Sequence, residues 1–109
     1  MEIYDYTTNG GKNVIMDYIF KLPKSIQVIA LNIRKVISED GIEAFNLLDT
    51  RKLKGKLYEI KFSNQRIMYV IKDSDSVYFL HICKKQKNKA EKKDIELAIK
   101  RAKNENLNI

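Results

Sequence analysis

The spacing of apolar residues changes once along this chain, and that change most constrains its fold. Between residues 13 and 41, apolar side chains recur every three or four positions, as on one face of a helix. Pro23 divides the region, because proline ends one helix and fits the first turn of the next. The pattern predicts two amphipathic helices joined by a tight turn, over residues 13–22 and 24–41. The predicted core face of the second helix consists of Ile26, Ile29, Ile33, Val36 and Ile37.

From residue 58 onwards, apolar and polar residues alternate, which is typical of strands with one buried face. Strands are expected at 58–62, 66–72 and 77–83, with turns at "SNQ" and "DSDS". The third, "VYFLHIC", is nearly all apolar and is expected at the centre of an antiparallel meander. A short strand at residues 2–6 precedes the helices, and a terminal helix carries the apolar residues Ile95, Ala98, Ile99 and Ala102. This order predicts an α+β fold: a helical hairpin packed on a small antiparallel sheet, with a C-terminal helix.

The composition fits one folded domain and excludes several classes of protein. A chain of 109 residues, 44% of them hydrophobic, can bury one core, so a single domain over residues 1–109 is expected. Charges interrupt every apolar run well before the roughly 20 residues of a membrane helix, and the N-terminus does not resemble a secretory signal. One cysteine, Cys83, and one histidine, His81, exclude an internal disulfide and a Cys/His metal cluster. A reducing cytoplasm is the expected compartment, and no cofactor or metal is expected.

The positive charge of the chain lies entirely in its second half. Residues 1–50 carry 5 basic and 7 acidic side chains, whereas residues 51–109 carry 16 basic and 7 acidic ones. The two halves therefore differ in net charge, −2 against +9, within a total of +7. Such asymmetry indicates an anionic partner, with nucleic acid as the first candidate and an acidic protein as the second.

Strand alternation places charged residues together on one face of the expected sheet. If the apolar residues of 58–62 contact the helices, Glu59 and Lys61 point to the opposite face. Arg66 begins the next strand and is expected opposite one of these two residues. The end of the third strand adds three more cations near the same edge: Lys84, Lys85 and Lys87.

Such a cluster has the groups that RNA cleavage needs without a metal ion. The 2′-OH of RNA is the nucleophile, so a protein has to align it, stabilise charge on the phosphorane and move two protons. Arg66, Lys84 and Lys85 are the candidates for binding the scissile phosphate, and Glu59 and Lys61 for moving protons. The alternative from the residues alone is a solvated strand face on which Arg66 forms a salt bridge with Glu59.

The segment "RKLKGK" ahead of the first of these strands is interpreted as a basic approach loop. Its lysines and arginine would bind backbone phosphates, together with a cation after the third strand; these residues are Arg51, Lys52, Lys54, Lys56 and Lys87. His81 lies in an apolar strand and is interpreted as a hydrogen-bonded structural residue. Cys83 is interpreted as a packing residue.

The order of these motifs resembles the RelE/ParE superfamily of bacterial toxins. The elements are "LYEIK", then "RIMY", then "LHICKK" ahead of a final helix, and the resemblance covers residues 45–103. Their order and spacing are most similar to the phage-derived, HigB-like branch. The resemblance implies a toxin of a type II toxin–antitoxin system that enters the ribosomal A site and cleaves mRNA. It also implies a cognate antitoxin, often a helix-turn-helix protein.

The same resemblance suggests site residues and leaves alternatives open. It places the alternating polar pair on Glu59 and Lys61, the strand arginine on Arg66, and the basic residue after the last strand on Lys84 or Lys85. RelE itself has a second lysine in place of Glu59 and a tyrosine early in the last helix, near the position of Glu91 here. The base that activates the 2′-OH is therefore Glu59, Lys61 or a further group. The alternative functions are a ParE-like, non-enzymatic inhibitor of DNA gyrase and a prophage remnant without toxicity.

Overall fold

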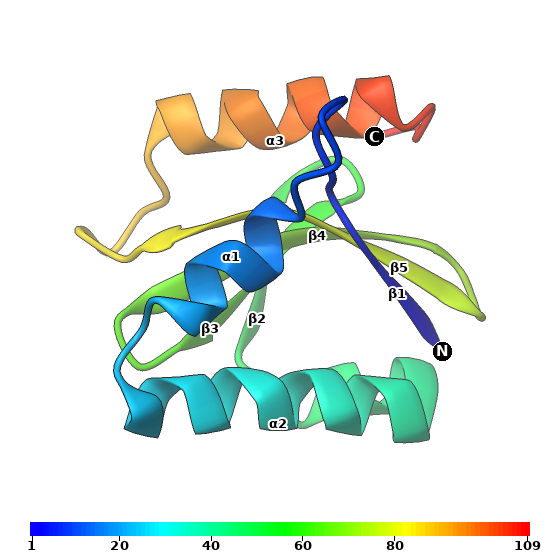
Figure 1. Cartoon of the computed structure of the whole chain (residues 1–109). Coiled ribbons are helices and arrows are strands. Elements are labelled where there is room, and N and C mark those ends of the chain that lie inside the picture. Colours follow the sequence, from blue (N-terminus) through cyan, green and yellow to red (C-terminus); the bar gives the residue numbers. More distant parts are fainter.

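The elements of the protein follow the chain as one strand, two helices, a 3-10 helix, four strands and a final helix (Figure 1). This computed structural model describes all 109 residues. The elements are β1 (Glu2–Asp5), α1 (Val14–Phe20), α2 (Lys24–Asp40), η1 (Gly41–Asn46), β2 (Thr50–Lys54), β3 (Leu57–Phe62), β4 (Gln65–Asp73), β5 (Ser76–Lys84) and α3 (Lys92–Asn104). The predicted α+β class, with two helices before the meander and one after it, is confirmed. None of the helices combines the length and the apolar character that crossing a membrane requires.

The five strands form a single mixed sheet in the order β1-β5-β4-β3-β2. Strands β2 to β5 are antiparallel neighbours, whereas β1 lies parallel to β5 at the sheet edge. The apolar strand β5 is therefore an interior strand, but β4 is the central one. The sequence predicted a purely antiparallel sheet, and that prediction was wrong for β1. The chain passes through both helices after β1, and β1 pairs in parallel with β5 at the far edge of the sheet from β2.

The prediction of a basic approach loop at residues 51–56 was wrong, because residues 51–54 belong to the edge strand β2 and only Gly55 and Lys56 form a turn. β2 pairs with β3, with Arg51 opposite Glu59 and Lys52 opposite Tyr58. Gly55, in the turn between these strands, has a φ of +57°, and a Cβ there would lie 2.7 Å from the carbonyl carbon of Ile109. Most residues of β2 are polar, which is common in edge strands, so its sequence lacks the alternation of a half-buried strand.

One face of the sheet is covered by α1 and α2 (Figure 1). Asn13 begins α1, since its side-chain oxygen accepts hydrogen bonds from the amides of Ile15 and Met16 at 3.1 and 3.0 Å. A cluster of 13 buried residues fills the space between these helices and the sheet: Ile15, Ile19, Ala30, Ile33, Ile37, Ala44, Ile60, Phe62, Ile67, Tyr69, Val77, Phe79 and Ile82. The prediction for Ile29 was wrong, because it is 41% exposed and the neighbouring Ala30 contacts the core instead.

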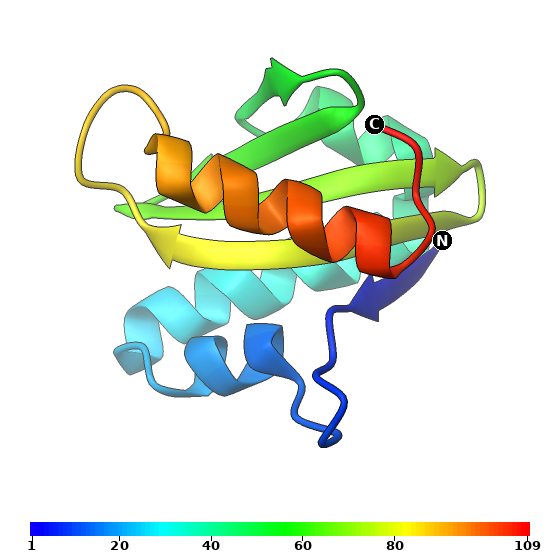
Figure 2. The same ribbon diagram turned by 90° about the horizontal axis from the view of Figure 1, so that it is seen from above.

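The opposite face is covered by α3, which lies across β4 and β5 (Figure 2). This core is smaller and contains Leu57, Met68, Val70, Leu80, Ala98, Ala102 and Leu107. Helix α3 contributes only alanines to the fully buried set, so its backbone can approach the sheet closely. Charged side chains of β3 and β4 also point to this face, beyond the N-terminal end of α3.

Candidate functional site

A fully buried ion pair lies at the centre of the predicted charged face. Glu59 of β3 is 0% exposed and Arg66 of β4 is 2% exposed. One guanidinium nitrogen of Arg66 donates to both carboxylate oxygens of Glu59, at 2.8 and 3.0 Å. The register places Lys61 directly opposite Arg66, as alternation predicted. The sequence left open a weak surface salt bridge between Arg66 and Glu59. The salt bridge is present, but it is shielded from water, so each charge depends strongly on the presence of the other.

Two further groups complete the surroundings of this pair. The guanidinium of Arg51, on β2, lies 3.6 Å from the second carboxylate oxygen of Glu59 and is itself part-exposed. The other terminal nitrogen of Arg66 donates to the backbone carbonyl of Lys87. Lys87 belongs to the segment between β5 and α3, which is also bonded to the β3–β4 turn through the amide of Lys85 and the carbonyl of Asn64 at 2.6 Å. This connecting segment, residues 85–91, therefore covers the ion pair on the α3 face of the sheet.

A bulge in β5 brings His81 to the same face. Met68 lies opposite His81 and Tyr69 opposite Phe79, so Leu80 is one residue in excess. The extra residue reverses the alternation, and both His81 and Cys83 then face α3. His81 Nε2 lies 2.8 Å from a carboxylate oxygen of Asp94, in the first turn of α3. The histidine thus connects the strand to the helix, in agreement with the structural role predicted for it.

The surroundings of His81 affect its protonation and that of Cys83. Burial lowers the pKa of His81 and so favours the neutral imidazole, whereas Asp94 has the opposite, smaller effect. Arg101 points a guanidinium nitrogen at His81 Nδ1, at 3.5 Å, and donates to the carbonyl of Leu80 at 2.9 Å. Burial, with a smaller contribution from Asp94, raises the pKa of the Cys83 thiol to about 12, so it is not a thiolate at neutral pH.

His81, Cys83 and Asp94 bring three potential metal-ligand atoms within 4.8 Å of one another. The sequence does not reveal this grouping, because Asp94 comes from a different element and the bulge at Leu80 leaves no signal in an apolar strand; one cysteine and one histidine had excluded a Cys/His cluster. In this structure the imidazole and the carboxylate bond to each other. Every buried side-chain polar atom of the protein has a partner.

The cations predicted around the ion pair are only partly brought together. Lys61 is half-buried and lies on the same face as Arg66, and Lys85 is half-buried in the connecting segment. Lys84 is exposed, but its position opposite Gln65 puts it in phase with the α1 face rather than the α3 face. Lys87 is exposed and its side chain pairs with Glu91 at 3.8 Å, so its backbone rather than its ammonium group contacts the site.

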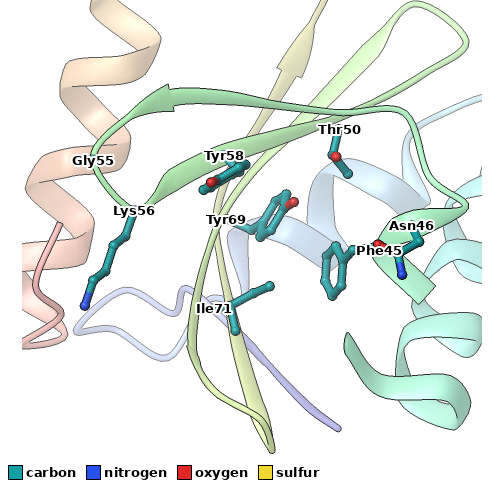
Figure 3. A pocket seen from close by; sticks show the side chains of 8 residues that line it. All are labelled: Phe45, Asn46, Thr50, Gly55, Lys56, Tyr58, Tyr69 and Ile71. Atoms are coloured by element: carbon teal, nitrogen blue, oxygen red, sulfur yellow. The ribbon is translucent and has the colours of Figure 1, made fainter. Parts of the chain in front are cut away.

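The predicted RNA-binding residues of β2 also divide between the two faces of the sheet. Arg51 shares the face of Glu59, whereas Lys52 shares the face of Tyr58. Lys54, at the end of β2, and Lys56, in the turn after it, are both exposed. Lys56 borders a cavity of about 360 Å³ on the α2 side, shown in Figure 3. The sequence did not predict this cavity, because η1 supplies one of its walls.

Residues 17–103 match the family described as Phage derived protein Gp49-like (DUF891). No curated protein matches the chain. The matched region runs from the first helix through the ion pair and the connecting segment to the end of α3. The chain therefore belongs to the phage-derived Gp49-like family, a family of RelE/ParE-type toxins.

Proposed function

We propose that this protein is the toxin of a type II toxin–antitoxin system, of the HigB-like kind, and that it cleaves mRNA on the ribosome in the cytoplasm. The observation that carries the proposal is the Glu59–Arg66 pair, held on one sheet face with Arg51 and Lys61 beside it. Fixed cations stabilise the negative charge that develops on the phosphorane, and a carboxylate among them can take part in proton transfer. The strongly basic second half of the chain supplies the long-range attraction for RNA.

The proposed reaction needs no metal ion. The 2′-OH of the nucleotide before the scissile bond loses its proton to a base and attacks the adjacent phosphorus. The bond to the 5′-oxygen of the next nucleotide then breaks, and that oxygen takes up a proton. The products are a 2′,3′-cyclic phosphate and a 5′-OH, so no water is consumed. Lys61 and Glu59 are the candidates for the proton transfers, and Arg66 and Lys85 for stabilising the phosphorane. Lys84 is left out of the proposed reaction, because it is in phase with the opposite face of the sheet.

In the structure, the main groups of this proposed site are bonded within the protein. Both oxygens of Glu59 are bonded to Arg66, and the connecting segment covers the guanidinium through the carbonyl of Lys87. In the proposed reaction, the part of this segment around Lys87 shifts away from Arg66, while Lys85 stays bonded to Asn64. Arg66 then reaches the phosphate together with Lys85. Lys61 is part-exposed and opposite Arg66, so it is the group that meets the RNA first.

The proposed antitoxin is a helix-turn-helix protein that competes with RNA for this edge of the sheet. Its contact surface would carry carboxylates opposite Lys61, Lys84 and Lys85, because charge complementarity determines both the rate and the specificity of such complexes. Since RNA binding depends mainly on phosphate contacts, it should weaken steeply with added salt.

The test is induction of the protein in cells, followed by mapping of transcript ends. Cleaved mRNA with 2′,3′-cyclic phosphate termini is expected for the unmodified chain, and Lys61→Ala should reduce cleavage by about 100-fold. Lys100→Ala is the matched control, because this exposed lysine of α3 lies away from the ion pair. Intact mRNA together with gyrase-dependent DNA breaks would contradict the proposal and favour the ParE-like alternative. Cleavage that survives in Lys61→Ala would remove the role given to Lys61.

A further inference from the structure

The cavity on the α2 side of the sheet is lined by a row of aromatic rings. Figure 3 shows Tyr58, Tyr69 and Phe45 side by side, from β3, β4 and η1. The ring centroids of Phe45 and Tyr69 are 5.0 Å apart and stacked, and those of Tyr58 and Tyr69 are 6.0 Å apart and tilted. Tyr69 is 2% exposed, whereas Tyr58 is 37% exposed. The row therefore has a buried floor and an open outer ring, which leaves a π-face accessible from solvent.

The polar groups of this cavity suit an anionic, planar ligand. Lys56 stands at one end of the row, with Thr50 and Asn46 at the other (Figure 3). No aspartate or glutamate side chain lines the cavity. The amide of Asn46 makes no hydrogen bond within the protein and is exposed, so it can both donate to and accept from a ligand. Burial raises the pKa of Tyr69 far above its usual value, so its ring stays a neutral phenol.

We propose that this aromatic cavity binds one unpaired nucleobase, whose phosphate is held by Lys56. Bases stack on aromatic side chains whatever their sequence, and this is the usual way in which proteins bind single-stranded RNA. A volume of about 360 Å³ is in the range of small-ligand pockets. Asn46 then contacts the edge of the base, which makes it the residue that distinguishes one base from another.

The position of the cavity connects it to the proposed cleavage site, and the inference rests on the proposed function in this respect. Tyr58 and Glu59 are neighbours on β3 and point to opposite faces of the sheet. On this side of the sheet, β2 is the only strand between β3 and the sheet edge. An RNA strand that passes over β2 can therefore place one base in the cavity while a neighbouring nucleotide lies near Arg51 and Glu59. Lys52, on the cavity face of β2, lies along that path.

The experiment is a binding titration that uses RNA which cannot be cleaved. The probes are the four nucleoside monophosphates and a short 2′-O-methyl oligoribonucleotide, which lacks the nucleophile. The protein contains 6 tyrosines and no tryptophan, so tyrosine fluorescence can be followed without a tryptophan signal, and the loss of quenching in Tyr58→Ala assigns the signal to the cavity. Quenching is expected, with amide NMR shifts concentrated at Asn46, Lys56 and Tyr69. Tighter binding of the oligomer identifies RNA as the ligand, and equal affinity for a monophosphate identifies a free nucleotide; either outcome supports the cavity.

Three variants separate stacking from other effects. Tyr58→Ala should weaken binding by about ten-fold or more, because base stacking is worth ~1–3 kcal/mol and ~1.4 kcal/mol corresponds to ten-fold. Tyr58→Phe keeps the ring and should bind normally. Tyr4→Ala is the matched control, since Tyr4 is an exposed tyrosine (47%) on β1, the opposite edge of the sheet. Far-ultraviolet circular dichroism verifies that each variant is folded.

The failure of this inference is distinguishable from failure of the proposed function. Probe binding unchanged in Tyr58→Ala, or NMR shifts that miss the cavity, would overturn the base site even if the protein cleaves mRNA. Cavity shifts that appear only with the antitoxin, and with no nucleotide probe, would overturn it in favour of a protein-docking site. Binding in the cavity without any mRNA cleavage would leave the base site standing and remove the proposed enzyme activity.

Discussion

On the side of α1 and α2 the sheet buries a cluster of 13 apolar residues, whereas on the side of α3 it buries 7 together with the Glu59–Arg66 pair. The first face gains its stability from apolar area removed from water, so each residue contributes in proportion to its contacts. On the second face, two charges have lost their hydration and depend on each other. Substitutions on the first face should therefore lower stability in proportion to the apolar area that is lost. On the second face, the loss of stability should depend on whether a buried charge is left without its partner.

This difference also bears on function. A buried ion pair is often no more stabilising than apolar residues of the same volume, so its presence is not explained by stability alone. The α3 face also holds the His81–Asp94 bond, next to the connecting segment that closes the ion pair. The face with the poorer core is thus the one that carries the proposed chemistry, and the other face supplies the rigid support.

Removing one partner of the ion pair should have the largest effect. Arg66→Met leaves Glu59 buried with only Arg51 nearby, at 3.6 Å, and should destabilise the fold by about 3–5 kcal/mol. The double variant Glu59→Leu, Arg66→Met should recover most of that loss, because no charge is left without a partner. Both are measured by urea unfolding followed by circular dichroism. The double variant should also lose toxicity, if the proposed function is right.

Lys35→Met supplies the matched control for this comparison. Lys35 pairs with Glu39 at 3.9 Å, and both side chains are well exposed. Its loss should change stability by less than about 0.5 kcal/mol. If Arg66→Met were as mild as this control, Glu59 would be hydrated in solution, and the contrast between the two faces would disappear.

A second change tests how tightly α3 packs. Ala98 is 0% exposed and lies between α3 and the sheet, where a larger side chain has no room. Ala98→Leu should cost about 1–3 kcal/mol through overpacking, and it should also shift the NMR signals of His81, because α3 carries Asp94. Ala98→Gly would separate helix propensity from packing, with an expected cost of about 1 kcal/mol. A neutral Ala98→Leu would mean that α3 can move outward freely, and the close approach inferred from its alanines would be wrong.

Periodicity predicted α1, α2, β3, β4, β5 and α3 because each has a continuous apolar stripe. It also predicted that Arg66 and Glu59 share one face, because strand alternation is a local property. Burial of the pair was not predictable, since Lys87 of the connecting segment, whose carbonyl accepts from Arg66, comes 21 residues further along the chain. The bulge at Leu80 was invisible for a different reason: apolar residues on both faces of β5 leave its register unspecified by sequence.

The face of α1 and α2 has a weak point of its own at the start of α1. Asn13 accepts two amide hydrogen bonds there and also donates to a carboxylate oxygen of Asp5 at 3.0 Å. Asn13→Ala should cost about 1 kcal/mol, within the range for lost N-caps. Asn13→Asp keeps the cap but brings a second carboxylate close to Asp5. The stability of this variant should therefore lie between those of the unmodified protein and Asn13→Ala. Thermal unfolding measures both variants, and equal stability of all three proteins would show that α1 does not need its cap.

The smallest effect concerns His81 and its dependence on pH. Because burial lowers the pKa of His81 in the folded state below the unfolded value of about 6.5, the unfolded chain binds the proton more readily. Stability from this residue is therefore fully present above about pH 6.5 and decreases as the pH falls towards the lower folded-state pKa, by at most about 1.4 kcal/mol per pH unit. Asp94, Arg101 and Cys83 surround the ring, and only the carboxylate among them opposes the trend. His81→Gln should abolish the slope in this window while leaving the Arg66→Met effect unchanged. A stability that rises as the pH falls below about 6.5 would contradict this prediction. It would mean that Asp94 stabilises the imidazolium and that the folded protein favours the charged form of His81.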